Sequence, residues 1–180
     1  MLRITIPGLE LWDSKKERFI HTKAQVLQLE HSLVSLSKWE SKYCKPFLSD
    51  KNKTAEETMD YIKIMTLTQN VDPEVYTRLT DEHIRMISEY IDAPMTATTF
   101  SKSEKEKHNK EIITAELIYY WMVALNIPFE CQKWHLNRLL TLIRVCNIKN
   151  APPKKRTKRE ILNRNAALNE ARRQRLNSKG

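Results

Sequence analysis

The sequence predicts a mainly α-helical protein that begins with a small antiparallel β element, an α+β fold. Three observations lead to this prediction. Residues 2–6 alternate apolar and polar side chains, apolar residues and capping signals recur at helical spacing after residue 31, and glycine occurs only at Gly8 and Gly180. We expect three parts: an N-terminal β element at 1–31, a helical body at 32–150, and a basic arm at 151–180 that becomes helical conditionally.

The first 31 residues carry the strand pattern. Residues 2–6 read Leu-Arg-Ile-Thr-Ile, and short alternating or β-branched pieces recur within 9–12 and 18–30. The polar residues 13–17 separate these pieces and suit a turn. We therefore expect one or two further strands after the first, joined by this turn.

Capping signals predict where the first helices of the body begin. Ser32 or Ser35 begins a short helix that runs through Tyr43, and the pair Thr54 and Glu57 forms a capping box for a helix that ends near residue 67. Asp72-Pro73-Glu74 begins a third, short helix that reaches residue 79. Thr80 begins a fourth, which Pro94 ends, and the threonine-rich residues 93–100 are expected to be extended.

Two strongly apolar helices complete the predicted body. A second capping box, Ser103 with Glu106, begins a long helix that runs to Asn126, and its apolar residues surround most of the helix. Pro128 separates it from a helix at 131–148. We expect the first of these helices to be buried on several sides, and that requirement favours self-association or binding of a client protein.

The basic arm holds almost all of the net charge. Residues 151–180 contain ten Lys or Arg and two acids, +8 of the formal net charge of +9. Asn150-Ala-Pro-Pro marks the boundary, and Thr157 with Glu160 caps a helix to residue 176 that has only a thin apolar stripe. We favour a helix that folds against a protein partner. A solvated tail without a specific partner and a segment that binds nucleic-acid phosphates remain open.

Composition excludes several classes of function. One internal glycine is too few for a phosphate-binding loop, and three cysteines with no paired spacing favour a reducing compartment. Cys131, His135 and Cys146 lie too far apart along one helix for a zinc site, and no catalytic triad suggests itself. The longest apolar run, 117–125, is too short to span a membrane, so we expect a soluble cytoplasmic protein with no cofactor, metal or catalytic residue.

Partner contact is the remaining role for the distinctive side chains. Trp39 and Trp134 each have Lys and Glu nearby in the sequence, so either residue suits a half-exposed anchor as well as a core position. We predict partner-binding residues on the 131–148 helix and in the arm: Trp134, Arg138, Leu139, Ile143, Lys154, Lys155, Arg156, Lys158, Arg159, Arg172, Arg173 and Arg175.

Four blocks of the sequence resemble a known family. These blocks are residues 32–48 with 53–57 following, residues 94–100, residues 126–150, and the basic end. Together they resemble the tail assembly chaperones of long-tailed bacteriophages, and the likeness spans about residues 1 to 180.

The resemblance implies a non-enzymatic role. Such chaperones are largely helical, self-associate as homo-oligomers, coat the tape measure protein in the host cytoplasm, help to recruit the major tail protein, and leave before the tail is complete. Two alternatives stay open. One is a structural head or connector protein that stays in the virion and contacts DNA through its arm, and the other is a DNA-binding regulator.

Overall fold

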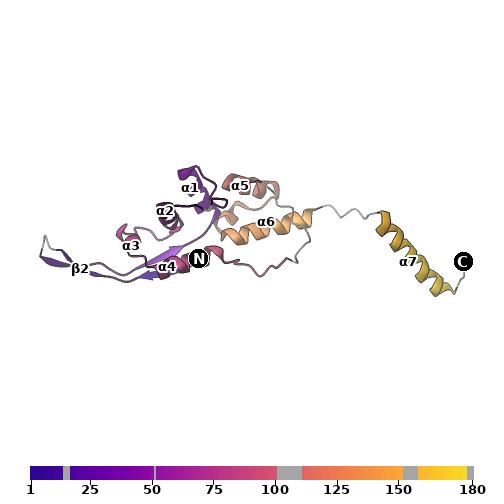
Figure 1. Cartoon of the computed structure of the whole chain (residues 1–180), viewed down its shortest axis with the longest axis horizontal. Coiled ribbons are helices and arrows are strands. Elements are labelled where there is room, and N and C mark those ends of the chain that lie inside the picture. The colour runs from indigo at the N-terminus through magenta and orange to yellow at the C-terminus, as the bar shows by residue number, and fades with distance from the viewer. Residues whose placement is uncertain (14–16, 51, 101–110, 152–157, 178–180) are drawn as a thin grey trace. The chain divides into compact units, whose positions relative to one another are not determined.

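The computed structural model describes residues 1–13, 17–50, 52–100, 111–151 and 158–177 (Figure 1). It is mainly helical, with two antiparallel strand ladders in the N-terminal residues, so the predicted fold class is confirmed. Isolated antiparallel bridges also join Leu29 to Thr66 and Ser32 to His135. The elements are β1(Leu2–Ile6), β2(Glu10–Asp13), β3(Arg18–His21), β4(Gln25–Leu29), α1(Leu33–Tyr43), α2(Ala55–Met65), α3(Glu74–Thr77), α4(Asp81–Asp92), α5(Ala115–Ala124), the 3-10 helix η1(Phe129–Lys133), α6(Leu136–Asn150) and α7(Lys158–Leu176). The chain divides into two compact units, Met1–Asn147 and Ile148–Gly180.

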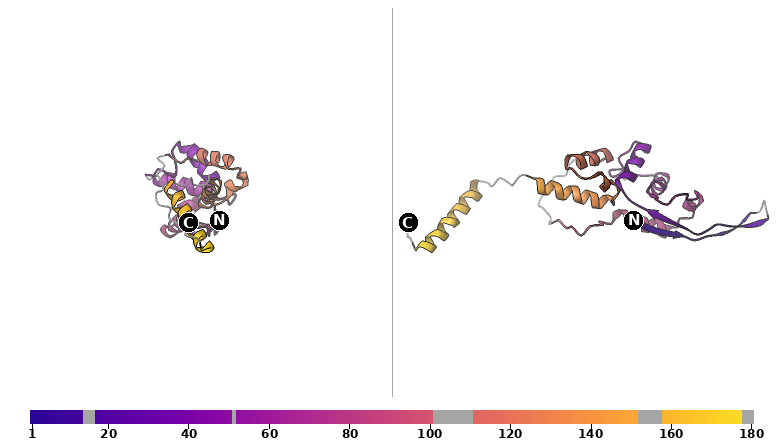
Figure 2. Two further views of the ribbon diagram at one scale, coloured as in Figure 1. Left: turned by 90° about the vertical axis from the view of Figure 1, so that its right-hand side faces the viewer. Right: turned by 180° about the vertical axis from the view of Figure 1, so that it is seen from behind.

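The N-terminal β element is an antiparallel hairpin in two ladders. β1 pairs with β4, from Leu2 opposite Leu29 to Ile6 opposite Gln25, and β2 pairs with β3. The β2–β3 ladder extends beyond the helices of the body, whereas β1–β4 lies against them (Figures 1 and 2). The predicted alternation holds in β1, where Ile4 and Ile6 are buried. Most of the predicted turn at 13–17 lies outside the described residues.

The chain's internal glycine lies where the two ladders meet. A Cβ atom on Gly8 would lie 2.3 Å from the carbonyl oxygen of Thr22, so the two strands approach more closely than a side chain allows. Arg78 bonds to both strands at this junction: its Nη1 donates to the carbonyl of Pro7 at 2.9 Å and to the Thr22 hydroxyl at 3.0 Å. This junction ties the hairpin to the segment between α3 and α4.

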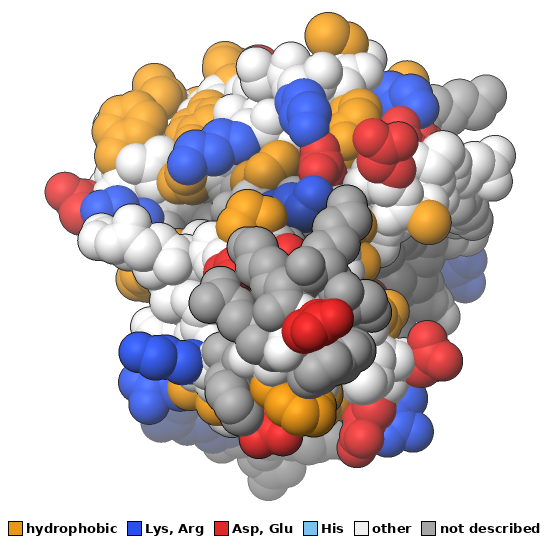
Figure 3. Space-filling model, turned by 90° about the vertical axis from the view of Figure 1, so that its left-hand side faces the viewer, with side chains coloured by type: hydrophobic (Ala, Val, Ile, Leu, Met, Phe, Trp, Pro, Cys, Tyr) orange, Lys and Arg blue, Asp and Glu red, His pale blue; other side chains and the backbone are white. Residues whose placement is uncertain are grey.

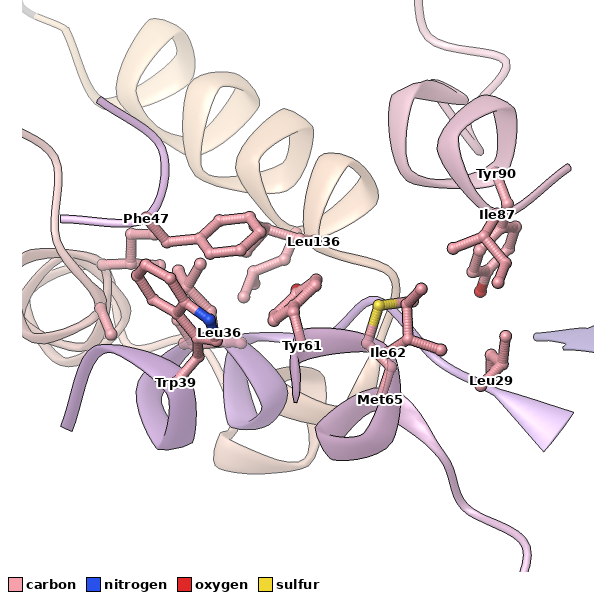
Figure 4. Close-up of a cluster of buried hydrophobic side chains, with 14 of the residues drawn as sticks. Leu29, Leu36, Trp39, Phe47, Tyr61, Ile62, Met65, Ile87, Tyr90 and Leu136 are labelled. Carbon is pink, nitrogen blue, oxygen red and sulfur yellow. The ribbon is translucent and has the colours of Figure 1, made fainter. Parts of the chain in front are cut away.

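The helices of the body enclose one hydrophobic core. In Figure 4, Trp39 of α1, Tyr61 of α2 and Leu136 of α6 converge from three helices, and Phe47 lies beside them. The Trp39 indole nitrogen donates to the Glu57 carbonyl at 2.9 Å, and its ring lies 5.0 Å from that of Phe47. Trp39 is fully buried, so of its two predicted roles the structure supports the core position.

The predicted caps begin the first helices. The hydroxyl of Ser32 accepts from the backbone of Ser35, and both bonds of the Thr54–Glu57 capping box are formed. Thr80 begins α4 in the same way, with His83 in the position that usually holds Glu or Gln. These bonds join residues three apart, so local sequence was sufficient to predict them.

Both predicted apolar helices differ from expectation. The first was expected to start near Ser103, but α5 begins after Thr114, whose hydroxyl accepts from the backbone of Leu117. The capping box at 103–106 lies outside the described residues. The second helix was predicted as one piece at 131–148. Instead η1 precedes an extended Trp134, and α6 begins at Leu136 because its N–H donates to the carbonyl of His31 at 2.7 Å.

Candidate protein-binding surfaces

The predicted contact residues of the body lie on α6 and just before it. Trp134 is half-buried and Arg138 is exposed, with the guanidinium carbon of Arg138 4.0 Å from the centre of the indole ring. Stacking on an aromatic face restricts a guanidinium while leaving its N–H edges available to a carboxylate. Trp134 and Arg138 thus form one preformed contact point, in which an extended residue before α6 meets a side chain from its first turn.

A segment distant in sequence lies along this side of α6. Asn137 donates through its amide nitrogen to the carbonyls of Ile91 and Ala93, each at 2.9 Å, and so holds the end of α4 against α6. Between the following threonines and α6 is a hollow of about 230 Å³, which we name the α6 groove. It is lined by Thr96, Thr98, Trp134, Arg138, Thr141, Leu142 and Val145.

Leu139 and Ile143 do not face this groove, which corrects the sequence prediction. Leu139 is 0% exposed and Ile143 is 4% exposed, and both belong to the hydrophobic core. The apolar side chains of α6 form two sets, one turned to the core and the other to the groove. Leu142 and Val145 line the groove in place of the two predicted residues.

The electrostatic character of this region is uniform. Residues 131–150 contain Lys133, Arg138, Arg144 and Lys149 but no Asp or Glu. Arg144 makes a second guanidinium–aromatic contact, its central carbon 4.2 Å from the centre of the Phe100 ring. Elsewhere the surface is mixed: the face toward the hairpin shows basic, acidic and hydrophobic side chains together (Figure 3). The α6 groove therefore suits an acidic or amphipathic partner.

The arm forms the helix α7 with none of its residues from Lys158 to Leu176 buried. The predicted contact residues Lys158, Arg159, Arg172, Arg173 and Arg175 are all exposed, and Lys154, Lys155 and Arg156 lie outside the described residues, as does the predicted cap Thr157. Ile161 and Leu168 are also exposed on α7. An exposed helix of this length has little tertiary stabilisation, so a partner surface is physically favourable.

A second exposed surface was not among the predicted contact residues. α5 buries one side against the core through Ala115, Ile118 and Met122, and its other side is open. On that open side Glu116, Tyr120, Val123 and Ala124 follow helical spacing, with Tyr120 65% and Val123 59% exposed. Burial of this helix on several sides was expected, but in the part of the chain that the structure describes this side stays exposed.

The polar groups inside the core include two histidines. His31 and His135 are buried, and each is hydrogen-bonded to a tyrosine. Nδ1 of His31 and the Tyr61 hydroxyl share a hydrogen bond of 2.6 Å, and Nε2 of His135 donates to the Tyr90 carbonyl at 3.0 Å. Within the described residues no group of three or more His, Cys, Asp or Glu is placed to hold a metal ion. Among the described helices, none has both the length and the apolar character needed to cross a membrane.

Comparison with known proteins adds no assignment. No protein-family model matches the chain. Searches of curated proteins and of solved structures likewise find no match. A functional proposal therefore depends on the surfaces described above and on the sequence resemblance.

Proposed function

We propose that the protein is a non-enzymatic tail assembly chaperone of a long-tailed bacteriophage, which binds the tape measure protein in the host cytoplasm. The observation that carries this proposal is the α6 groove, where Arg138 is stacked on Trp134 beside half-buried apolar side chains. The resemblance of residues 32–48 and 126–150 to that family supplies the biological setting. The major tail protein is a second partner in this proposal.

The groove suits a helical client. An amphipathic helix inserts apolar side chains into a groove and places its polar residues at the rim. Leu142 and Val145 offer the apolar lining, and Arg138 offers a bidentate partner for a carboxylate at the rim. A small contact of this kind is individually weak, which suits a chaperone that must be released before the tail is complete.

The arm adds a second, electrostatic contact. Residues 151–180 have a net charge of +8, which attracts acidic stretches of a long helical client and speeds encounter. Linking two weak contacts in one chain raises the total affinity without a large interface. The arm and the α6 groove thus act as two linked contacts on the same client.

Co-expression with the tape measure protein tests the proposal. We expect the tape measure protein to stay in solution and to copurify with the chain, and deletion of residues 151–180 to abolish copurification. Undiminished copurification without these residues would show that the arm makes no contribution to client binding. No copurification with the intact chain would reject the chaperone function itself.

The charge of the arm also favours a second candidate, a virion head or connector protein whose arm contacts DNA. A basic segment binds phosphates with a steep salt dependence and needs no aromatic residues, and the arm has none. Mass spectrometry of purified particles separates the two candidates, because a departing chaperone is absent from mature virions. DNA affinity that falls steeply with salt and disappears with the arm would favour the DNA-binding alternatives.

A further inference from the structure

The open side of α5 has a distinctive combination of apolar and acidic groups. We name Glu116, Tyr120, Val123 and Ala124 the α5 face. Residues 111–132, which include all of α5, contain three glutamates, Glu111, Glu116 and Glu130, and no Lys or Arg. Each of these glutamates is exposed. The α5 face is therefore an apolar helix surface within a stretch of sequence whose charged residues are all acidic, and in space Lys45 lines a hollow together with Glu116.

Such a surface favours a particular kind of occupant. A helix that is apolar on all sides is ordinarily buried on all sides, so the α5 face gains free energy from being covered. Pairing with the α5 face of another copy would bring its glutamates close to the glutamates of the second α5 segment, with no basic residue from either segment to neutralise them. The occupant that fits is a helix that combines apolar side chains with basic ones.

The chain itself contains a helix with this chemistry. α7 has six Lys or Arg and two Glu between residues 158 and 176. It also exposes Ile161, Leu162, Leu168 and Leu176, and none of its residues is buried. At 1.5 Å per residue α7 extends over roughly 28 Å and α5 over roughly 15 Å, so one α7 covers the length of one α5 face.

We propose that, in the absence of a client, α7 of one copy docks on the α5 face of a second copy. Leu168 and Ile161 of the docked helix cover Tyr120 and Val123, and its arginines pair with Glu116 and Glu130. The contact joins two different surfaces, and two copies that each place α7 on the other's α5 face form a closed dimer. This inference goes beyond the proposed function, because it concerns the protein without its client.

Photo-crosslinking of the intact chain tests the contact directly. p-Benzoylphenylalanine replaces Tyr120, and the protein is prepared in a ¹⁴N form and a ¹⁵N form. The two forms are mixed and then irradiated. We expect crosslinked peptides that join position 120 of one isotope to residues 158–176 of the other. Crosslinks to residues 158–176 of the same isotope only, or none to this segment, would overturn the proposal.

Charge variants test the electrostatic part. Glu116→Lys with Glu130→Lys should weaken dimer formation by about tenfold or more in sedimentation velocity, because each reversal replaces attraction with repulsion. Glu89→Lys on α4 is the control, since Glu89 is also acidic and exposed but pairs with Arg85 outside the α5 segment. Restored dimerisation when the double variant also carries Arg172→Glu and Arg173→Glu would support the pairing, and circular dichroism confirms folding of each variant.

The outcome is separable from that of the proposed function. A dimer that forms as expected while the tape measure protein fails to copurify would reject the chaperone proposal alone. The opposite result is also possible: the chain copurifies with the client, but Glu89→Lys and the α5 double variant affect self-association equally. That result would reject the α5 contact alone.

Discussion

The imidazole rings of His31 and His135 lie edge to face in the core, with 5.2 Å between their centroids. Both residues are buried. Nδ1 of His135 accepts from the backbone N–H of Asn137, and Nε2 of His135 donates to the Tyr90 carbonyl. This arrangement requires a neutral His135, because protonation of Nδ1 would remove an acceptor. Burial, reinforced by the neighbouring His135, lowers the pKa of His31 to about 3, and burial also lowers the pKa of His135.

These shifted pKa values predict an acid-sensitive fold. A histidine in the unfolded chain has a pKa near 6.5, so between about pH 6.5 and pH 3 the unfolded state binds protons that folded His31 does not. The free energy of unfolding therefore falls as the pH is lowered, by up to about 1.4 kcal/mol per pH unit for each histidine. Urea unfolding at about pH 7.5, 6 and 5 measures this slope in a range largely above carboxyl titration.

A conservative variant isolates the contribution of His31. His31→Gln cannot titrate but retains a group that hydrogen-bonds Tyr61, so it should flatten the pH dependence while remaining folded at neutral pH. A wild-type stability that is constant between pH 7.5 and 5 would contradict the assignment of two buried neutral histidines.

Glu40 predicts a large effect of a single side chain on stability. Its buried carboxyl group accepts from the backbone N–H of Phe47 at 2.8 Å and from that of Ala115, the first residue of α5, at 2.7 Å. Glu40→Ala leaves two buried N–H groups without this acceptor, and we expect the free energy of unfolding to fall by about 2–4 kcal/mol in urea. Exposed Glu56→Ala is the control, and similar losses for the two variants would argue against this role of Glu40.

A side chain at position 8 should lower the free energy of unfolding, because it would clash at the junction of the two ladders. Gly8→Ala places its Cβ 2.3 Å from the Thr22 carbonyl oxygen, a backbone atom that cannot rotate away. We expect a loss of about 1–3 kcal/mol in thermal or urea unfolding. The exposed neighbour variant Ala24→Ser should change stability by less than about 0.5 kcal/mol. A neutral Gly8→Ala would mean that the hairpin opens at this point without cost.

The sequence predicted the features that depend on local bonds. The Thr54–Glu57 capping box and the strand alternation at 2–6 were predicted correctly because each is decided by residues within a few positions. The start of α6 was not, since it depends on a bond between Leu136 and His31 across the body. Trp134 and Arg138 were named from the sequence as candidate contact residues, but their stacking was not predicted. Nor was the threonine wall of the α6 groove, because only tertiary packing brings residues 96–98 to α6.

Arg138 offers the sharpest test of client binding at the α6 groove. Arg138→Glu reverses the charge at the rim, and we expect the affinity for the tape measure protein to fall about 10–100-fold, because a like charge then faces the client carboxylate. Arg138→Lys should bind with intermediate affinity, since an ammonium neither stacks on Trp134 as a plane nor forms a bidentate pair. Arg85→Glu on α4 is the matched exposed control, and titration calorimetry with purified client segments measures the affinity of all three variants.

Because Arg138 lies at the surface, the melting temperature should change little, so that weaker binding reports on the contact itself. Arg138→Glu that binds as tightly as the unaltered chain would remove the α6 groove from the client interface.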